Sequence, residues 1–207
     1  MQVKSEELTP FTKENDMETG YASQAIRERL IIAGIRELEN HGLNDFSLRR
    51  VAVACEVSCA APYRHVKDKD ELILEIIRYI NHQWTLLQEQ IVRAIPTDDT
   101  RRPVELGVAH IRFWIANPNF RSVLLLDDPN PNNPRLAERR KISSGIEAQI
   151  ASYCQKQGFD PATTARKTYA FQALVYGTML MLGNQELSNT PETIDMIRIQ
   201  LEQILTA

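Results

Sequence analysis

The sequence predicts an all-α protein with a small N-terminal helical unit and a larger C-terminal helical domain. Its apolar residues recur at steps of three and four positions, which is the period of a helix and not of a strand. Several helix starts carry a capping residue, and two of them, Asp160-Pro161 and Thr190-Pro191, add a proline at the first helical position. At 207 residues, 43% hydrophobic and 25% charged, the chain can bury a sizeable core.

Residues 1–20 show no periodicity and mix Ser, Glu, Thr, Lys and Pro, so we expect a disordered arm. The first helix is predicted over 21–40, with buried positions at Ile26, Leu30, Ala33, Ile35 and Leu38. Gly34 in its middle indicates a close helix crossing. Gly42 suits the left-handed position that ends a helix, and Phe46 is expected to fill the core of the small N-terminal unit.

Residues 46–72 predict a helix-turn-helix. Ser47 can cap a helix whose apolar positions are Leu48, Val51, Ala52 and Cys55. The pattern pauses over 55–57, and Ser58 can cap a second helix over 59–66. Two short helices joined by such a turn are typical of a unit whose second helix enters the DNA major groove. The alternative is a solvated helical hairpin in an ordinary α-domain.

The candidate DNA-binding residues combine small, hydroxyl-bearing and basic side chains. Basic groups suit phosphate contacts, and small residues let the backbone approach a duplex closely. Residues 21–69 hold eight Lys or Arg against six Asp or Glu, a net charge of +2 in a chain whose overall charge is −3. The candidates are Ser47, Arg49, Arg50, Ser58, Cys59, Ala60, Ala61, Tyr63, Arg64, His65, Lys67 and Lys69.

This stretch resembles the N-terminal DNA-binding domain of TetR-family repressors. The resemblance is carried by Ser47-Leu-Arg-Arg-Val-Ala, Val57-Ser58, Ala60-Ala-Pro-Tyr-Arg-His65 and Lys67-Asp-Lys-Asp-Glu-Leu72, and extends back to Ile26. It implies a repressor that binds a palindromic double-stranded DNA operator as a homodimer and is released by a small-molecule effector. On this basis 21–67 is the DNA-binding domain and 68–207 the ligand-binding and dimerisation domain.

Two positions depart from the family pattern. Glu56 stands where the turn usually has Gly, and a positive φ there would be strained. Pro62 follows Ser58 by four residues, so it removes a helical hydrogen bond, and the second helix is expected to start later or to be tightened. We hypothesise that Glu56→Gly raises both stability and DNA affinity.

Seven helical or loop segments follow. Asp68 and Glu71 form a capping-box-like pair that opens an amphipathic helix reaching Ile95; it is either a lever between the domains or a plain core helix. Further helices are expected over 100–117, 134–157, 161–184 and 191–205. Between the first two lie an apolar piece, 120–126, and a turn-rich loop, 127–134, which we interpret as a gate or surface feature.

The last two helices carry more apolar surface than a peripheral helix needs. We expect them to pair with the same helices of a second chain, and an intramolecular bundle is the alternative. The predicted interface residues are Ala165, Ala173, Gly177, Leu180, Ile194, Ile197 and Leu201. The predicted ligand-binding residues, which could equally be plain core, are His110, Phe113, Trp114, Phe120, Leu124, Tyr169, Phe171, Tyr176 and Met179.

Other chemistry is not indicated. The four histidines show no metal-ligand spacing, and no phosphate loop or nucleophile elbow is present, so we predict no metal, no cofactor and no catalytic residue. No segment predicts a targeting signal or a membrane span, which favours a cytoplasmic protein. Cys55 is expected to be buried and Cys59 exposed, leaving a redox switch conceivable. The rival interpretations are a helical small-molecule-binding protein or enzyme without specific DNA binding, and a scaffolding module.

Overall fold

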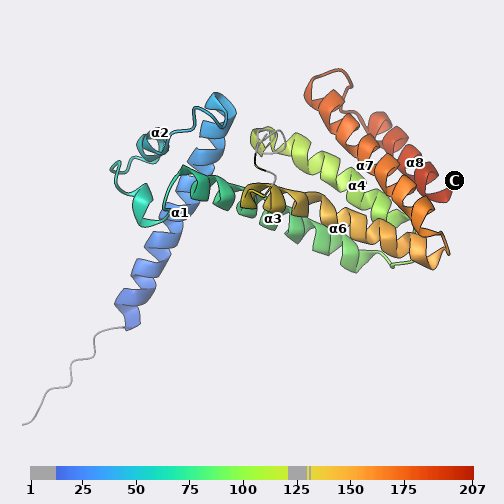
Figure 1. The fold of residues 1–207 in the computed structure, drawn as a ribbon, viewed down its shortest axis with the longest axis horizontal. Helices are drawn as coiled ribbons and strands as arrows, with labels where there is room; N and C mark the ends of the chain where they lie inside the picture. The colour runs from blue at the N-terminus through green and yellow to red at the C-terminus, as the bar shows by residue number, and fades with distance from the viewer. Residues whose placement is uncertain (1–12, 121–129, 131) are drawn as a thin grey trace, which may run out of the picture.

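The computed structural model describes residues 13–120, 130 and 132–207, with side chains from Gln24 onward. The described residues form seven α-helices and no strand, so the predicted all-α class is confirmed (Figure 1). A small unit at one end holds α1 (Lys13–His41), α2 (Leu48–Ala54) and the 3₁₀ helix η1 (Pro62–Arg64). A larger bundle at the other end holds α4 (Arg101–Ala116), α6 (Pro134–Lys156), α7 (Pro161–Gly183) and α8 (Pro191–Thr206).

The first helix begins eight residues earlier than its apolar period predicted. α1 starts at Lys13 and not at Tyr21, so 13–20 are helical and not part of a disordered arm; residues 1–12 lie outside the described residues. α1 ends as expected at Gly42, whose φ of +69° lets its N–H bond to the Leu38 carbonyl (2.9 Å). Phe46 is buried in the small core, as predicted.

Helix α3 (Lys69–Ala94) runs from the small unit into the bundle (Figure 1). Its predicted cap is confirmed, because the Asp68 carboxylate accepts from the Glu71 N–H (2.9 Å) and the Glu71 carboxylate accepts from the Lys67 N–H. Near its start α3 crosses α1 so closely that a Cβ built on Gly34 would lie 2.7 Å from Ile76 Cδ1. The crossing accounts for a glycine in the middle of α1.

Helix α4 lies at the centre of the bundle and contacts α3, α6, α7 and α8. Its N-terminus is held by the Asp99 carboxylate, which accepts from the Arg101 N–H (2.9 Å). Asp160 caps α7 by accepting from the Ala162 and Thr163 N–H groups, and Thr190 caps α8. The Asp-Pro and Thr-Pro starts predicted from sequence are therefore confirmed.

A second connection between the two parts runs through the 3₁₀ helix η2 (Pro118–Phe120), which follows α4 and contacts α1. With its amide oriented to satisfy both groups, Asn119 donates to both oxygens of the Glu39 carboxylate, at 3.0 and 3.1 Å. The small unit is thus joined to the bundle by α3 and by this contact. Among the described helices, none is both long enough and apolar enough to cross a membrane.

Candidate nucleic-acid interface and ligand-binding region

The turn after α2 is a Schellman motif with glutamate in the position that usually favours glycine. Ser47 caps α2 as predicted, accepting from the Arg50 N–H, and Leu48, Val51 and Ala52 face the core. At the other end the Glu56 N–H bonds to the Val53 carbonyl and the Val57 N–H to the Ala52 carbonyl, at 3.0 and 3.1 Å. Glu56 therefore occupies the left-handed position, with φ +57°, and the predicted backbone strain is present.

The predicted second helix over 59–66 is wrong in length and type. The structure has a turn followed by η1, which is only three residues long and has no side-chain cap, so Ser58 does not cap it. Pro62 is the cause, because it has no N–H and the Ser58 carbonyl accepts from the Ala61 N–H instead (2.9 Å). The first hydrogen bond of the α-helical type after the turn is made by Val66, whose N–H donates to the Pro62 carbonyl.

Two arginines fix this hairpin against α1. Arg50 donates through Nε to the Glu37 carboxylate (2.7 Å) and contacts Asp45, while the same carboxylate accepts from the Ser47 N–H (3.1 Å). The hydrogen bond that Arg50 donates to Glu37 is the main reason that the pKa of Arg50 is raised. Arg29 donates to the Cys55 carbonyl. Arg50, which was predicted to contact phosphate, is therefore bonded to Glu37 and Asp45 of its own chain.

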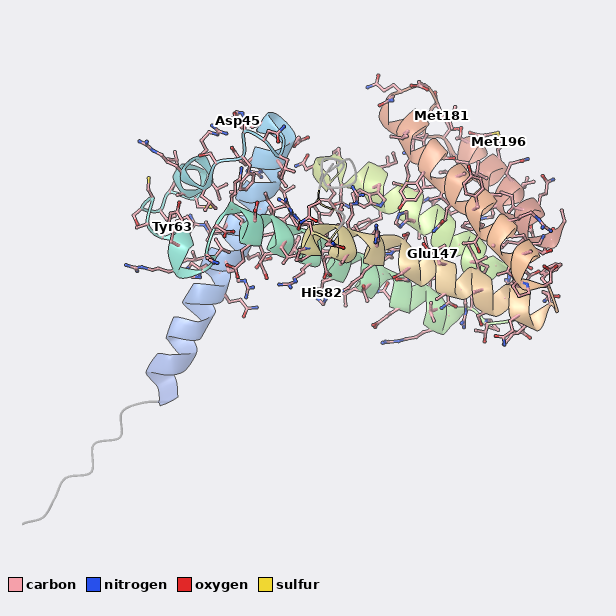
Figure 2. The ribbon with its side chains drawn as sticks, in the orientation of Figure 1. Asp45, Tyr63, His82, Glu147, Met181 and Met196 are labelled. Atoms are coloured by element: carbon pink, nitrogen blue, oxygen red, sulfur yellow. The ribbon has the colours of Figure 1, made fainter. Side chains whose placement is uncertain are left out.

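The remaining candidate DNA-binding residues are partly or fully exposed around the hairpin. Tyr63 is 61% exposed and lies at the end of the molecule remote from Met181 and Met196 (Figure 2). The exposed basic side chains are Arg49, Arg64, Lys67 and Lys69, and the small exposed residues are Ser58, Cys59 and Ala60; Ser47, Ala61 and His65 are partly exposed. These exposed basic and small side chains come from one short segment of the chain, which also carries the exposed Glu56.

The cysteines fall where the sequence placed them. Cys55 is buried and its Sγ lies 3.3 Å from the Arg29 carbonyl, while Cys59 is exposed. Burial raises the pKa of the Cys55 thiol, which disfavours the reactive thiolate. Cys55 therefore acts as packing in the hairpin.

The bundle contains a cluster of aromatic rings between α3, α4, η2 and α7. Five predicted ligand-binding residues, the half-exposed Tyr176 among them, belong to it, and so does Trp84 on α3, which was not predicted as one. Neighbouring ring centroids lie 4.7–6.4 Å apart. The aromatic cluster comprises Trp84, His110, Phe113, Trp114, Phe120 and Tyr176.

The other predicted ligand-binding residues do not join the aromatic cluster. Tyr169 is 76% exposed on the outside of α7, so its assignment to a pocket is wrong. Phe171 is fully buried, and its ring would lie 2.8 Å from a Cβ on Gly107, which makes it tight core. Met179 is buried, and Leu124 lies outside the described residues.

His110 is the one buried histidine among the described residues. Trp114 Nε1 donates to His110 Nε2 (3.0 Å), and the Trp84 ring lies edge to face with the imidazole. Burial lowers the pKa of His110 to about 3, because the surrounding rings offer the charged form no compensation. The imidazole is therefore neutral at ordinary pH and acts as a hydrogen-bonding group.

The outer surface of α7 and α8 differs from the predicted interface. Ile194, Ile197 and Leu201 are buried inside the single chain, where α8 packs on α4 and α7, so their assignment to a surface between chains is wrong. Ala165, Ala173, Gly177 and Leu180 do lie at the surface. The exposed apolar residues of these two helices include Tyr169, Tyr176 and Met181 on α7 and Met196 and Ile199 on α8. Figure 2 labels Met181 and Met196 among them.

No family model matches the sequence, and no curated protein matches it either. Solved structures do match its fold. A candidate fatty acid metabolism regulator from Clostridium perfringens has a TM-score of 0.72 at 15% identity, covering 86% of this chain and 99% of that one. A TetR family transcription regulator from Marinobacter aquaeolei VT8 has a TM-score of 0.68 at 16% identity, covering 90% and 97%.

The transcriptional regulator FadR from Bacillus subtilis, solved in complex with stearoyl-CoA, has a TM-score of 0.66 at 12% identity and covers 87% of this chain and 97% of its own. Many of the structures similar to this chain are TetR-family transcriptional regulators, and they match most of its length. The chain therefore has the fold of that family.

Proposed function

We propose that the protein is a TetR-family transcription regulator, not an enzyme, that binds operator DNA and responds to a small molecule. The observation that carries the proposal is that α2, the Glu56 turn, η1 and the loop after it expose both basic and small side chains. Basic groups would fix the hairpin on phosphates while Cys59, Ala60 and Tyr63 face base edges. The fold shared with TetR-family regulators supports this assignment.

The DNA should be a palindrome read by two copies of the chain. A single η1 presents few base-contacting groups, and a two-fold dimer doubles them over two half-sites. The exposed apolar residues of α7 and α8 favour these helices as the dimer surface, at the end of the bundle away from the hairpin (Figure 1).

The DNA-binding test begins with selection of duplexes from a random pool, followed by fluorescence anisotropy on the selected duplex and a scrambled one. We expect at least about a thousandfold preference for the selected duplex. We also expect a steep loss of affinity with salt, because phosphate contacts release counterions. Equal binding to both duplexes would refute sequence-specific recognition and would favour the rival function, a helical ligand-binding protein.

The dimer test uses two isoleucines of α8 that point in opposite directions. Ile199 is 53% exposed and Ile197 is 2% exposed. We expect Ile199→Glu to give a monomer that keeps its thermal stability as a fold. Ile197→Ala should instead destabilise each chain by about 2–5 kcal/mol through the cavity it leaves. Light scattering of the wild type at micromolar concentration showing a single chain's mass would overturn the dimer.

Ligand control would act by a shift between conformations that space the two hairpins differently. Trp84 on α3 and Phe120 in η2 both belong to the aromatic cluster, and both elements reach the DNA-binding unit. A ligand that moves these rings would therefore act on α1 through Asn119 and Glu39 as well as through α3. Asn119→Ala should leave operator affinity in place and weaken its loss on effector binding; an unchanged response would rule out this route.

Repression relieved by a ligand is the mode of action that we propose, as the sequence resemblance to TetR-family repressors implies. The FadR structure holds stearoyl-CoA, so a bundle of this shape can accommodate a small molecule. A reporter gene placed behind the selected operator would test the direction of control, with repression expected. Activation of the reporter by the protein would contradict the repressor role while leaving DNA binding intact.

A further inference from the structure

Two buried N–H groups in the aromatic cluster lack a hydrogen-bond acceptor within the part of the chain that the structure describes. They are Trp84 Nε1 and His110 Nδ1. Both side chains are only 1% exposed, and their rings are in contact, with centroids 4.7 Å apart. A buried donor without a partner loses its hydration and gains nothing in return, so such groups are rare in native folds. Two on adjacent rings indicate a specific missing partner.

The hydrogen bond from Trp114 fixes the chemistry of that partner. An indole N–H can only donate, so His110 Nε2 must present its lone pair to Trp114. The single proton of the neutral imidazole is then on Nδ1, which makes Nδ1 a donor like Trp84 Nε1. Both unpartnered groups therefore require an acceptor.

The aromatic rings around the two donors disfavour a charged ligand at this position. Phe113 lies 5.6 Å from Trp84 and Tyr176 lies 6.4 Å from His110, so the walls near the two donors are aromatic rings. Two neutral N–H groups cannot offset the cost of removing a carboxylate from water. A carbonyl oxygen, which has two lone pairs and no proton, matches two donors without leaving a group of its own unpaired.

Water is the alternative occupant, since a buried water usually makes about three hydrogen bonds and could accept from both donors, but it then has two protons of its own to place. One acceptor is available nearby in sequence: Asn81 Oδ1, one turn before Trp84 on α3, is also unpartnered, while its Nδ2 donates to Glu138. A water shared by Trp84, His110 and Asn81 is the competing occupant.

We propose that Trp84 and His110 form the polar anchor of the effector site. Its ligand is a neutral, largely apolar molecule that carries a hydrogen-bond-accepting oxygen, such as a ketone, ester or amide carbonyl. The role as effector site rests on the proposed regulatory function, whereas binding itself does not. Tyr176, 37% exposed at the edge of the aromatic cluster, marks the side from which the ligand enters.

The test compares three probes of nearly equal shape. Cyclohexyl methyl ketone has the neutral acceptor, isopropenylcyclohexane replaces the carbonyl oxygen by a CH₂ group, and cyclohexanecarboxylate carries a charge. Both tryptophans of the chain lie in the aromatic cluster, so fluorescence and the two indole N–H signals in ¹⁵N NMR report on the site directly. We expect the ketone to bind at least about fivefold more tightly than the other two and to shift the Trp84 indole proton downfield.

Two variants complete the test: Trp84→Phe removes the indole N–H together with part of the indole ring, and Tyr176→Phe removes only a hydroxyl and keeps its ring. Trp84→Phe should abolish the preference for the ketone over isopropenylcyclohexane, and Tyr176→Phe should retain it. Thermal melts establish that each variant is folded; if Trp84→Phe is not, the indole shift in the wild type decides alone. Equal affinity for ketone and hydrocarbon overturns the proposal. So does a Trp84 indole proton already at its hydrogen-bonded position without ligand, which indicates the shared water.

The same ketone separates this inference from the proposed function. Loss of operator affinity on ketone binding supports both. Ketone binding with unchanged operator affinity keeps the site and overturns its role as an effector site. Specific operator binding by a protein that shows no preference for the ketone keeps the DNA-binding function and overturns the site.

Discussion

At the scale of single residues, the hairpin contains a conflict between local backbone geometry and side-chain chemistry. Glu56 has a φ of +57° in a Schellman turn, a conformation in which a side chain with a Cβ is strained. Its carboxylate is also exposed beside the surface proposed to meet phosphates. Gln185, which follows α7, has the same backbone conformation with φ +63° but is distant in sequence from the candidate DNA-binding residues. Comparing substitutions at Glu56 and Gln185 therefore separates the effect of backbone strain on stability from the effect of the Glu56 charge on DNA binding.

Glu56→Gly should stabilise the protein by about 0.5–1 kcal/mol, because glycine adopts positive φ without a Cβ penalty. It should also tighten DNA binding most strongly at low salt, where the lost repulsion between carboxylate and phosphate is least screened. Denaturant titration and anisotropy measure the two effects. Gln185→Gly is the control: it should stabilise similarly and leave DNA affinity unchanged. A Glu56→Gly variant with unaltered stability and DNA affinity would contradict both the backbone strain and the repulsion between carboxylate and phosphate.

Arg49 and Arg50 are adjacent in sequence but have different roles in the structure. Arg49 is exposed, whereas Arg50 is held by Glu37 and Asp45. Arg49→Gln should leave the melting temperature unchanged and reduce the slope of log affinity against log salt by about one, as expected for one lost phosphate contact. Arg50→Gln should lower the melting temperature, because the nearly buried Glu37 carboxylate then loses its cationic partner. The reverse pattern would show that Arg50 is free to reach DNA.

At the scale of the elements, sequence predicted the capped helix starts well, missed the start of α1 by eight residues, and predicted the faces of the helices less well. Asp68, Asp160 and Thr190 cap their helices because capping depends on the few residues beside each start. The inner face of α8 could not be chosen, because apolar residues such as Ile197 and Ile199 occur on both of its sides. The shortening of the recognition segment was foreseen from Pro62, but its collapse to three residues depends on the whole turn.

For the candidate site residues too, sequence predicted what depends on neighbouring residues and missed what depends on contacts between elements. The candidate DNA-binding residues were predicted from a local motif, and their role stays a prediction. That motif could not reveal the ion pair of Arg50, because its partner Glu37 lies on another helix. The aromatic cluster joins rings from four elements, so sequence could name His110 and Phe113 as aromatic candidates but could not bring Trp84 to them. Tyr169 was assigned to a pocket together with Phe171, two positions further along α7. Residues two apart lie on different sides of a helix, so Phe171 faces inward and Tyr169 faces outward.

The glycines of α4 and α7 allow a matched test of how tightly the bundle elements pack. A Cβ on Gly107 would lie 2.8 Å from the Phe171 ring and 3.0 Å from Leu201, whereas a Cβ on Gly177 would meet nothing within 4 Å. Gly107→Ala should destabilise the fold by about 1–3 kcal/mol through overpacking. Gly177→Ala should stabilise it by up to about 1 kcal/mol through helix propensity. Denaturation curves that rank the two variants in the opposite order would show that α4 and α7 can separate freely.

At the scale of the whole molecule, the small N-terminal unit and the bundle are joined at two places among the residues that the structure describes. Helix α3 runs through both, and η2 meets α1 where Asn119 donates to Glu39. Both connections lead to the aromatic cluster, which holds the buried His110. Because the cluster supports both connections, the protonation of His110 affects the stability of the assembled chain and not only that of one helix.

The stability of the protein should therefore fall as the pH drops below about 6.5, the pKa of an unfolded histidine. In the folded chain burial lowers the pKa of His110 to about 3, so between these values the unfolded chain binds one more proton. That difference reduces the free energy of unfolding by about 1 kcal/mol for each pH unit of acidification. The range from pH 6.5 to 5 is diagnostic, because ordinary carboxylates remain ionised there. Denaturant titrations of the wild type and of His110→Gln, which keeps an acceptor for Trp114, measure the effect. The variant should lose the slope, and an equal slope in both proteins would place the acid sensitivity at other groups.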